Sequence, residues 1–212
     1  MYEEILNPKQ KELLQKFEFL KDSNYYLAGG TALALQLGHR TSVDFDFYSP
    51  EPFDQNKLLE QFEQLFPKVL VQEISNGTLL MDIEGVNISF FLYKYLAIVN
   101  LVPYGFIKLS GVEDIAAMKI IAIVQRGTMR DFVDLYYLLK RYSLEQIIGF
   151  TIKKFTSYNI EVVLRAITYF KEADEQSLLE RGIMVLDKSF SWEECKKIII
   201  VKAMEYQRKI VS

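Results

Sequence analysis

Residues 26–48, YLAGGTALALQLGHRTSVDFDFY, join a short apolar strand to a helix through a glycine pair, and a second strand follows that carries two aspartates. Gly29 and Gly30 stand at the strand-to-helix turn, where a residue without a side chain lets the backbone approach a ligand closely. The free N–H groups of the first helical turn then point at any anion bound there. We therefore expect Gly29, Gly30 and Thr31 to form a phosphate-binding turn.

The second strand, SVDFDFY, alternates polar and apolar side chains. Ser42, Asp44 and Asp46 share one face of it, and the apolar residues between them would be buried. Two ionised carboxylates at alternate positions repel each other unless a cation lies between them, and oxygen ligands of this kind suit Mg²⁺. A lone glycine pair is usually only a turn, and a lone aspartate pair is often a solvated strand edge. Their order and spacing together favour a phosphate and metal site.

A second informative stretch covers residues 110–137. Ser110 and Glu113 have the spacing of a capping box, so we expect a helix that begins there and ends at Gly127. Thr128 with Asp131 has the spacing that caps the next helix. This stretch therefore predicts two consecutive helices.

These two helices carry four charged residues of interest. Lys119 and Arg126 are seven residues apart and lie on one face of the first helix, where two cations can meet a triphosphate. Asp131 and Asp134 share a face near the start of the second helix. Taken singly, such a lysine is more often solvated, and an aspartate near a helix start is more often a cap. Asp134 can also orient the lysine or the arginine.

Three separated motifs resemble, in the same order, the AbiEii/AbiGii toxin family of nucleotidyltransferases, which belongs to the DNA polymerase beta-like superfamily. The motifs are the GGT turn at residue 29, the segment HRTSVDFDF at 39–47, and the pattern K-x6-R-G-x3-D-F-x-D that begins at residue 119. The resemblance covers roughly residues 20–140. It implies an Mg²⁺-dependent toxin of a toxin–antitoxin or phage-defence system, which transfers a nucleotide from an NTP to an RNA end, such as that of tRNA, and is restrained by an antitoxin protein.

The resemblance also assigns roles to individual residues. The implied catalytic residues are Asp44, Asp46, Lys119 and Asp131, the implied nucleotide-binding residues are Gly29, Gly30, Thr31, Arg40, Ser42 and Arg126, and the implied metal ligands are Asp44 and Asp46. From the sequence alone, Arg40 and Ser42 can either order the turn before the second strand or touch the nucleotide.

One position departs from the superfamily pattern, in which a third carboxylate commonly comes from a strand after the aspartate pair. Here that strand, VNISFFLY, has Ser89 at the expected position and Asn87 on the same face. Asp82 and Glu84, on the preceding strand and its turn, are candidates to substitute. The departure keeps open a nucleotide-binding or partner-binding module with an inactive site. A third reading is a structural partner whose aspartate face is filled by an arginine or lysine.

The order of the elements predicts an α+β fold: a minimal nucleotidyltransferase mixed sheet with flanking helices, followed by an α-helical C-terminal region. Strands are expected at 69–74, 79–83 and 86–93, after the two strands around the glycine pair. We expect residues 1–110 to form the nucleotidyltransferase core and residues 111–212 to complete the active site and form a helical lobe.

Composition limits the partners and the compartment. The 212 residues carry a net charge of −3 with a pI of about 5.4, so no global basic field indicates nucleic-acid binding. A local patch would be needed, and residues 140–154 and 195–209 are locally basic enough to guide an RNA backbone or an acidic antitoxin. The single cysteine, Cys195, excludes an internal disulfide and fits a cytoplasmic protein. No run of about 18 apolar residues is present, so we expect no membrane span.

Overall fold

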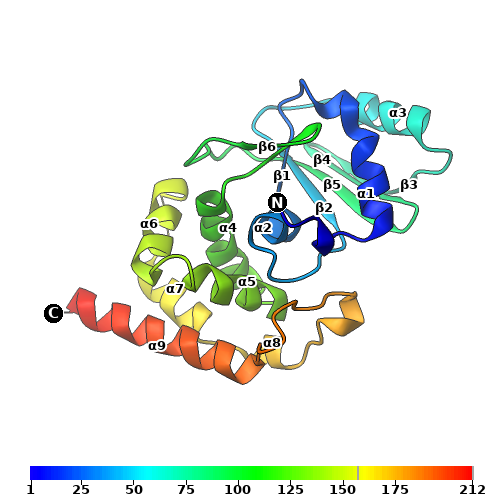
Figure 1. The fold of residues 1–212 in the computed structure, drawn as a ribbon. Coiled ribbons are helices and arrows are strands. Elements are labelled where there is room, and N and C mark those ends of the chain that lie inside the picture. The colour runs from blue at the N-terminus through cyan, green and yellow to red at the C-terminus, as the bar shows by residue number, and fades with distance from the viewer. Residues whose placement is uncertain (157, 212) are drawn as a thin grey trace.

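The computed structural model describes residues 1–156 and 158–211, and these residues form a seven-stranded sheet with helices around it (Figure 1). The strands are β1 Tyr26–Ala28, β2 Phe45–Ser49, β3 Leu70–Ser75, β4 Thr78–Ile83, β5 Val86–Leu92, β6 Val102–Tyr104 and β7 Ile107–Leu109. The α-helices are α1 Pro8–Gln15, α2 Gly29–Leu37, α3 Gln55–Leu65, α4 Val112–Gln125, α5 Met129–Leu139, α6 Leu144–Lys154, α7 Ile160–Ile167, α8 Lys171–Asp174 and α9 Trp192–Val211, and short 3₁₀ helices lie at η1 Glu3–Ile5, η2 Phe17–Leu20 and η3 Leu179–Arg181.

The sheet is mixed, with the strand order β3-β4-β5-β2-β1-β7-β6. β2 lies in the centre, antiparallel to β1 and parallel to β5. The predicted α+β class, the mixed sheet with flanking helices and the helical C-terminal region are confirmed. β6 and β7 were not expected; β7 pairs in parallel with β1 through Leu27 and Leu109. Each of them has only three residues, too few for an alternating pattern to stand out in the sequence.

One face of the sheet is sealed by aromatic packing. Phe47 of β2 and Phe90 of β5 stack with ring centroids 4.9 Å apart. Phe17 of η2 meets Phe47 edge to face at 5.9 Å, and Phe62 of α3 meets Phe17 at 5.7 Å. All four rings are fully buried, so η2 and α3 close this face, which is therefore core.

The opposite face carries the polar residues of β2. In the strand register, Asp46 lies beside Ala28 on one side and Ser89 on the other. In the next row, Tyr48 lies between Tyr26 and Phe91. The alternation predicted for residues 42–48 thus holds within β2, which begins at Phe45 and not at Ser42.

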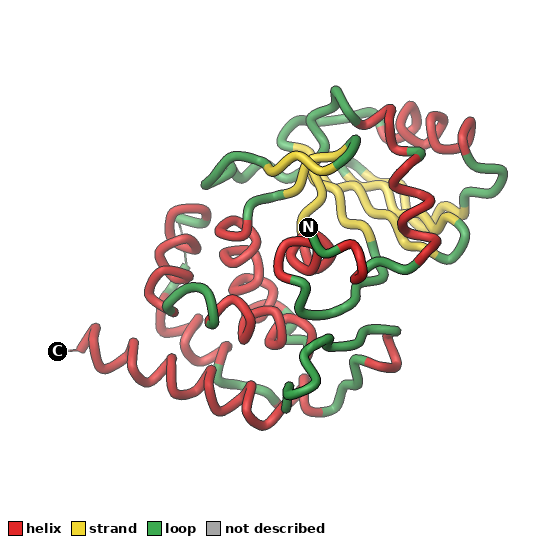
Figure 2. The backbone as a smooth tube through the Cα atoms, in the orientation of Figure 1, coloured by secondary structure: helices red, strands yellow, loops and turns green. Residues whose placement is uncertain are grey.

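The helices that follow the sheet occupy the other half of the molecule. Figure 2 shows the strands gathered on one side and the helices after residue 111 on the other. α4 connects the two halves, because it contacts α2 as well as α5, α6 and α7. The predicted boundary at residues 110 and 111 lies between β7 and α4. Among the described residues, no helix is long and apolar enough to cross a membrane.

Helix caps decide where several helices begin. The Asn7–Gln10 and Ser143–Gln146 pairs form complete capping boxes for α1 and α6. The capping box expected at Ser110 is wrong. The Ser110 N–H donates to the carbonyl of Leu27 at 2.8 Å, which extends the pairing of β7 with β1, and α4 begins one residue later with Gly111 as its N-cap.

Candidate active site

A cleft of about 230 Å³ opens where the β1–α2 turn, the start of β2, the middle of α4 and the start of α5 meet. Its lining residues are Gly29, Gly30, Thr31, Arg40, Ser42, Asp44, Asp46, Tyr48, Phe91, Met118, Lys119, Ala122, Arg126 and Arg130. Every residue expected in the site from the sequence is among them except Asp131. Segments separated by up to about a hundred residues therefore converge on one cavity.

The two carboxylates lie at the edge of the glycine turn. Asp46 is paired with Ala28, the residue before the turn, and a Cβ added to Gly29 would lie 3.1 Å from Asp46 Oδ2. Burial raises the pKa of Asp46, and the negative charge of Asp44 raises it further. Asp44 accepts a hydrogen bond from Asn87 Nδ2 at 3.2 Å and faces Arg130 Nη1 at 3.7 Å. The negative charges of Asp44 and Asp46 therefore repel each other at this edge, and a bound cation would favour the ionised form of both.

A third acid does not join this pair in the described part of the chain. Ser89 lies directly beside Asp46 in the sheet, at the position expected from the sequence. Asp82 is on the same face but two strands away, and its carboxylate accepts the Gly85 N–H at 3.0 Å. Glu84 forms an ion pair with Lys9. No group of three or more His, Cys, Asp or Glu residues in the described chain is placed to hold a metal.

Beneath the cleft, Asp134 holds a buried cluster of cations. Its Oδ1 accepts hydrogen bonds from Arg40 Nε and His39 Nε2, both at 2.7 Å. Its Oδ2 accepts from Arg40 Nη2 at 2.9 Å and lies 2.6 Å from Lys119 Nζ. Burial alone would raise the pKa of Asp134, but the charges of Arg40 and Lys119 hold it well below its usual value. Burial lowers the pKa of His39, so its ring is neutral and donates to the carboxylate.

Asp131 is the second buried carboxylate that pairs with Lys119. It lies 2.9 Å from Lys119 Nζ and 3.0 Å from Arg126 Nε, and it accepts the Thr128 hydroxyl at 2.6 Å. Burial opposes its ionisation, yet Lys119 and Arg126 lower its pKa. Asp131 is fully buried, so it orients the two cations from behind and does not face the cavity.

Other expected ligands are also held by internal bonds. The Thr31 hydroxyl bonds to the Ser42 hydroxyl at 2.7 Å and to the carbonyl oxygen of Asp44. Arg40 is almost fully buried on Asp134. These three side chains border the cleft while fixing the segment before β2, whereas Arg126, with half of its side chain exposed, remains open to a ligand.

Gly30 must lack a side chain for this arrangement to exist, because a Cβ there would lie 2.4 Å from Arg40 Nη2. We expect Gly30→Ala to push Arg40 off Asp134 and to lower the free energy of unfolding by about 1–3 kcal/mol, as overpacking does. Gly149→Ala is the control, because nothing lies within 4 Å of its added Cβ inside α6. That variant should gain about 0.5–1 kcal/mol. Urea unfolding measures both, and a Gly30→Ala protein as stable as the wild type would contradict this packing.

Five lining residues were not expected from the sequence: Tyr48, Phe91, Met118, Ala122 and Arg130. Arg130, in the first turn of α5, faces Asp44. Its position next to Asp131 in the sequence pattern could have marked it as a site residue. Tyr48 and Phe91 form an aromatic wall with ring centroids 5.6 Å apart. They follow Asp46 and Ser89 by two residues, so strand alternation places them on the same face.

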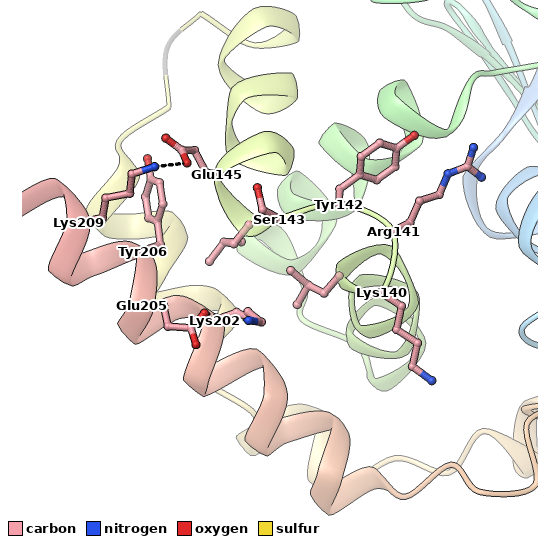
Figure 3. A pocket seen from close by; sticks show the side chains of 11 residues that line it. Lys140, Arg141, Tyr142, Ser143, Glu145, Lys202, Glu205, Tyr206 and Lys209 are labelled. Atoms are coloured by element: carbon pink, nitrogen blue, oxygen red, sulfur yellow. Dashed lines mark hydrogen bonds and ion pairs between the residues drawn. The ribbon is translucent and has the colours of Figure 1, made fainter.

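A second concavity lies far from this chemistry. A groove of about 330 Å³ separates the α5–α6 turn from α9, and Figure 3 shows the side chains of both predicted basic stretches around it. Lys209 pairs there with Glu145, and Lys202 with Glu205 at 2.8 Å. Its lining includes neither an aspartate pair nor a glycine turn, so it does not compete with the cleft as the phosphate and metal site.

Comparison with known proteins agrees with the geometry. The family model described as "Nucleotidyl transferase AbiEii toxin, Type IV TA system" matches residues 12–99 and 106–183, a longer span than the motifs indicated. A protein of Aquifex aeolicus (strain VF5), described as uncharacterized, is 35% identical over 208 residues, which are 95% of this chain and 97% of that protein.

Solved structures show the same fold. JHP933 from Helicobacter pylori superposes with a TM-score of 0.61 at 17% identity, covering 96% of this chain and 94% of that one. The antibiotic-resistance factor ANT(2'')-Ia superposes with a TM-score of 0.52 at 13% identity, covering 69% of this chain and 91% of that one.

Proposed function

The chain belongs to the AbiEii family of nucleotidyl transferase toxins of Type IV toxin–antitoxin systems, and from that premise we propose that it transfers a nucleotide from an NTP to an RNA acceptor with the help of Mg²⁺. The observation that carries the proposal is the convergence in one cleft of Gly29 and Gly30, the carboxylates of Asp44 and Asp46, and Arg126.

The β1–α2 turn supplies the phosphate-binding part of the proposal. Gly29 has a φ of +66°, a backbone conformation that favours glycine, and it is the first residue of α2. The first N–H groups of this helix can donate to phosphate oxygens, and Arg126 can reach the same oxygens from α4. Lys119 contributes its positive charge from behind, because it is buried between Asp131 and Asp134.

Asp44 and Asp46 fit an Mg²⁺ ion. Mg²⁺ is commonly held by one or two carboxylates together with substrate phosphates, so two acids suffice. The raised pKa of Asp46 beside a second carboxylate supports this fit, because a bound cation would favour the ionised pair. Bound there, the ion would supply charge stabilisation to the reacting phosphoryl group.

In the proposed reaction an acceptor hydroxyl attacks the α-phosphorus of the NTP. A new phosphodiester bond forms and the proton of the hydroxyl passes to solvent water. The bond to the β-phosphate breaks, and pyrophosphate leaves with the electron pair. Arg126 neutralises charge on that leaving group. With Ser89 in place of a third acid, the residues act mainly by positioning and electrostatics, which account for most phosphoryl-transfer catalysis.

The finer parts of the proposal are the acceptor and the cellular role. We propose that the acceptor is RNA, with tRNA as the first candidate, and that an antitoxin protein counteracts the activity. We further propose that the pair acts in the cytoplasm as a toxin–antitoxin or phage-defence system. The alternative is a nucleotide-binding module with an inactive site, and the specific observation in its favour is Ser89 beside Asp46.

A transfer assay separates the two. Purified protein is incubated with each α-³²P-labelled NTP, Mg²⁺ and total RNA. We expect label to move to RNA, to stop moving when EDTA is added, and not to move from γ-labelled NTP. NTP binding without any transfer to RNA would favour the inactive module, and the absence of NTP binding would contradict both.

A further inference from the structure

A row of tyrosines continues the cleft away from the carboxylates and onto the surface. Tyr48 lines the cleft, its ring lies 5.0 Å from that of Tyr93, and Tyr93 lies 5.1 Å from Tyr95. We call Tyr48, Tyr93 and Tyr95 the tyrosine ladder. It begins inside the cavity and ends at a ring that is 50% exposed, followed by Leu96 at 84%.

The ladder is longer than one nucleobase. Ser89 lies beside Asp46, and Tyr93 follows Ser89 by four residues of extended chain, a distance of about 13 Å. Tyr95 lies beyond that. A single base covers less than this length, so the ladder has room for at least one further base at its outer end.

The loop that presents the outer end is rigidly held. Lys154 of α6 donates to the Leu96 carbonyl at 3.0 Å and pairs with Asp114 at 2.6 Å. Asp114 also accepts the backbone N–H groups of Ile98 and Val99 at 2.9–3.1 Å. Lys154 and Asp114 are both buried, and Tyr95 itself rests on Phe155 at 4.7 Å. An exposed aromatic ring on a loop anchored by a buried ion pair is preorganised to bind.

Tyrosine hydroxyls beside the cleft are free to bind a ligand. In the part of the chain that the structure describes, the hydroxyls of Tyr26, Tyr48 and Tyr93 make no hydrogen bond to another protein group, and none of them is sealed from solvent. Tyr26 stacks on Tyr48 with ring centroids 6.1 Å apart, so its ring adjoins the inner end of the ladder. Lys94, which precedes Tyr95 in the chain, and Lys153, which precedes Lys154 in α6, are both exposed. Aromatic rings with nearby cations are how proteins bind unpaired nucleic-acid strands.

We propose that the tyrosine ladder binds the unpaired terminal nucleotides of the RNA acceptor, with a base stacked on Tyr95 and the chain running inward past Tyr93 toward Asp46. The inference rests on the proposed transfer to RNA and adds where that RNA lies. This placement favours an acceptor with a single-stranded end, since bases inside a double helix are stacked on one another and are not free to stack on a protein ring.

Binding of RNA to the whole protein tests the proposal without requiring catalysis. Fluorescence anisotropy with a labelled 12-nucleotide single-stranded RNA is measured for the wild type, Tyr95→Ala and Tyr95→Trp. We expect Tyr95→Ala to weaken binding about tenfold, within the range of base–aromatic stacking, and Tyr95→Trp to restore it. Tyr169→Ala is the matched control, because Tyr169 is 53% exposed in the helical half, and it should bind RNA as the wild type does.

Two further arms separate stacking from other causes. An abasic oligomer of the same length and charge should bind the wild type and Tyr95→Ala equally. NTP affinity, measured by calorimetry, should be the same for both proteins. The proposal is overturned if the wild type does not bind the RNA, if Tyr95→Ala binds it as tightly, or if Tyr95→Ala loses NTP affinity instead. It is also overturned if the ladder captures the antitoxin and not RNA. RNA binding that depends on Tyr95, without any transfer of nucleotide, would support this inference and contradict the proposed transferase activity.

Discussion

Replacing Asp46 by asparagine is expected to reduce transfer of label from NTP to RNA by about a thousandfold, since charge stabilisation by a bound metal is worth several kcal/mol. Asparagine keeps the shape of the side chain beside Ala28 and Ser89 and removes only its charge. The loss should appear with every NTP and should not be restored by more RNA.

The stability of the same variant distinguishes a functional carboxylate from a structural one. The pKa of Asp46 is raised in the folded protein, so its ionised form is less stable there than in the unfolded chain. Ionised Asp46 therefore lowers stability at neutral pH, and Asp46→Asn without metal should melt at the same temperature as the wild type or higher. Asp82→Asn is the control on the same sheet face outside the cleft, and it should retain transfer. An Asp46→Asn enzyme that keeps wild-type transfer would refute the role given to this carboxylate.

Asp134→Ala is expected to have the largest effect on stability. It would leave Arg40 and Lys119 buried without the partner that holds them, and breaking a buried pair in this way costs about 3–5 kcal/mol. Urea unfolding at pH 7 measures the change. Asp174→Ala, which removes an exposed pair with Lys196, is the matched control and should change stability by no more than about 1 kcal/mol.

The pH dependence of that difference follows from the lowered pKa of Asp134. A carboxyl group whose pKa is lower in the folded state stabilises the fold at every pH above its unfolded value, close to 4, and loses that contribution as the pH falls further. The gap between the wild type and Asp134→Ala should thus be constant from pH 5 to 8 and narrow below about pH 4. A gap that instead grows in acid would show that Asp134 is not the ionised centre of the cluster.

The parts of the site that local sequence specifies were predictable. The glycine turn, the alternation around Asp44 and Asp46, and the heptad spacing of Lys119 and Arg126 depend only on backbone geometry, and all of these residues line one cleft. The predicted catalytic and ligand roles themselves stay predictions. The resemblance put Ser89 at the position of a third acid, and Ser89 does lie beside Asp46.

What the sequence could not provide was pairing between distant segments. Arg40 bonds to Asp134 across 94 positions, and no periodicity indicates that its guanidinium faces inward and not toward a nucleotide. Asp131 lies behind Lys119 and does not face the cavity. Its position near a helix start is the same in either case, so the sequence could not distinguish the two orientations. Ser110 had the spacing of a cap, but its N–H was taken by Leu27 of a strand more than eighty residues earlier. Tertiary contacts therefore decided the orientations of Arg40 and Asp131 and the start of α4.

The most direct measurement is a crystal structure of the protein with Mn²⁺ and a non-hydrolysable NTP analogue, with the metal located by its anomalous signal. The account predicts Mn²⁺ against the carboxylates of Asp44 and Asp46, with the triphosphate at the N–H groups of Gly29 and Gly30 and within reach of Arg126. Mn²⁺ and triphosphate bound elsewhere, for example in the lysine-lined groove beside α9, with the cleft closed by Arg130 on Asp44, would contradict it.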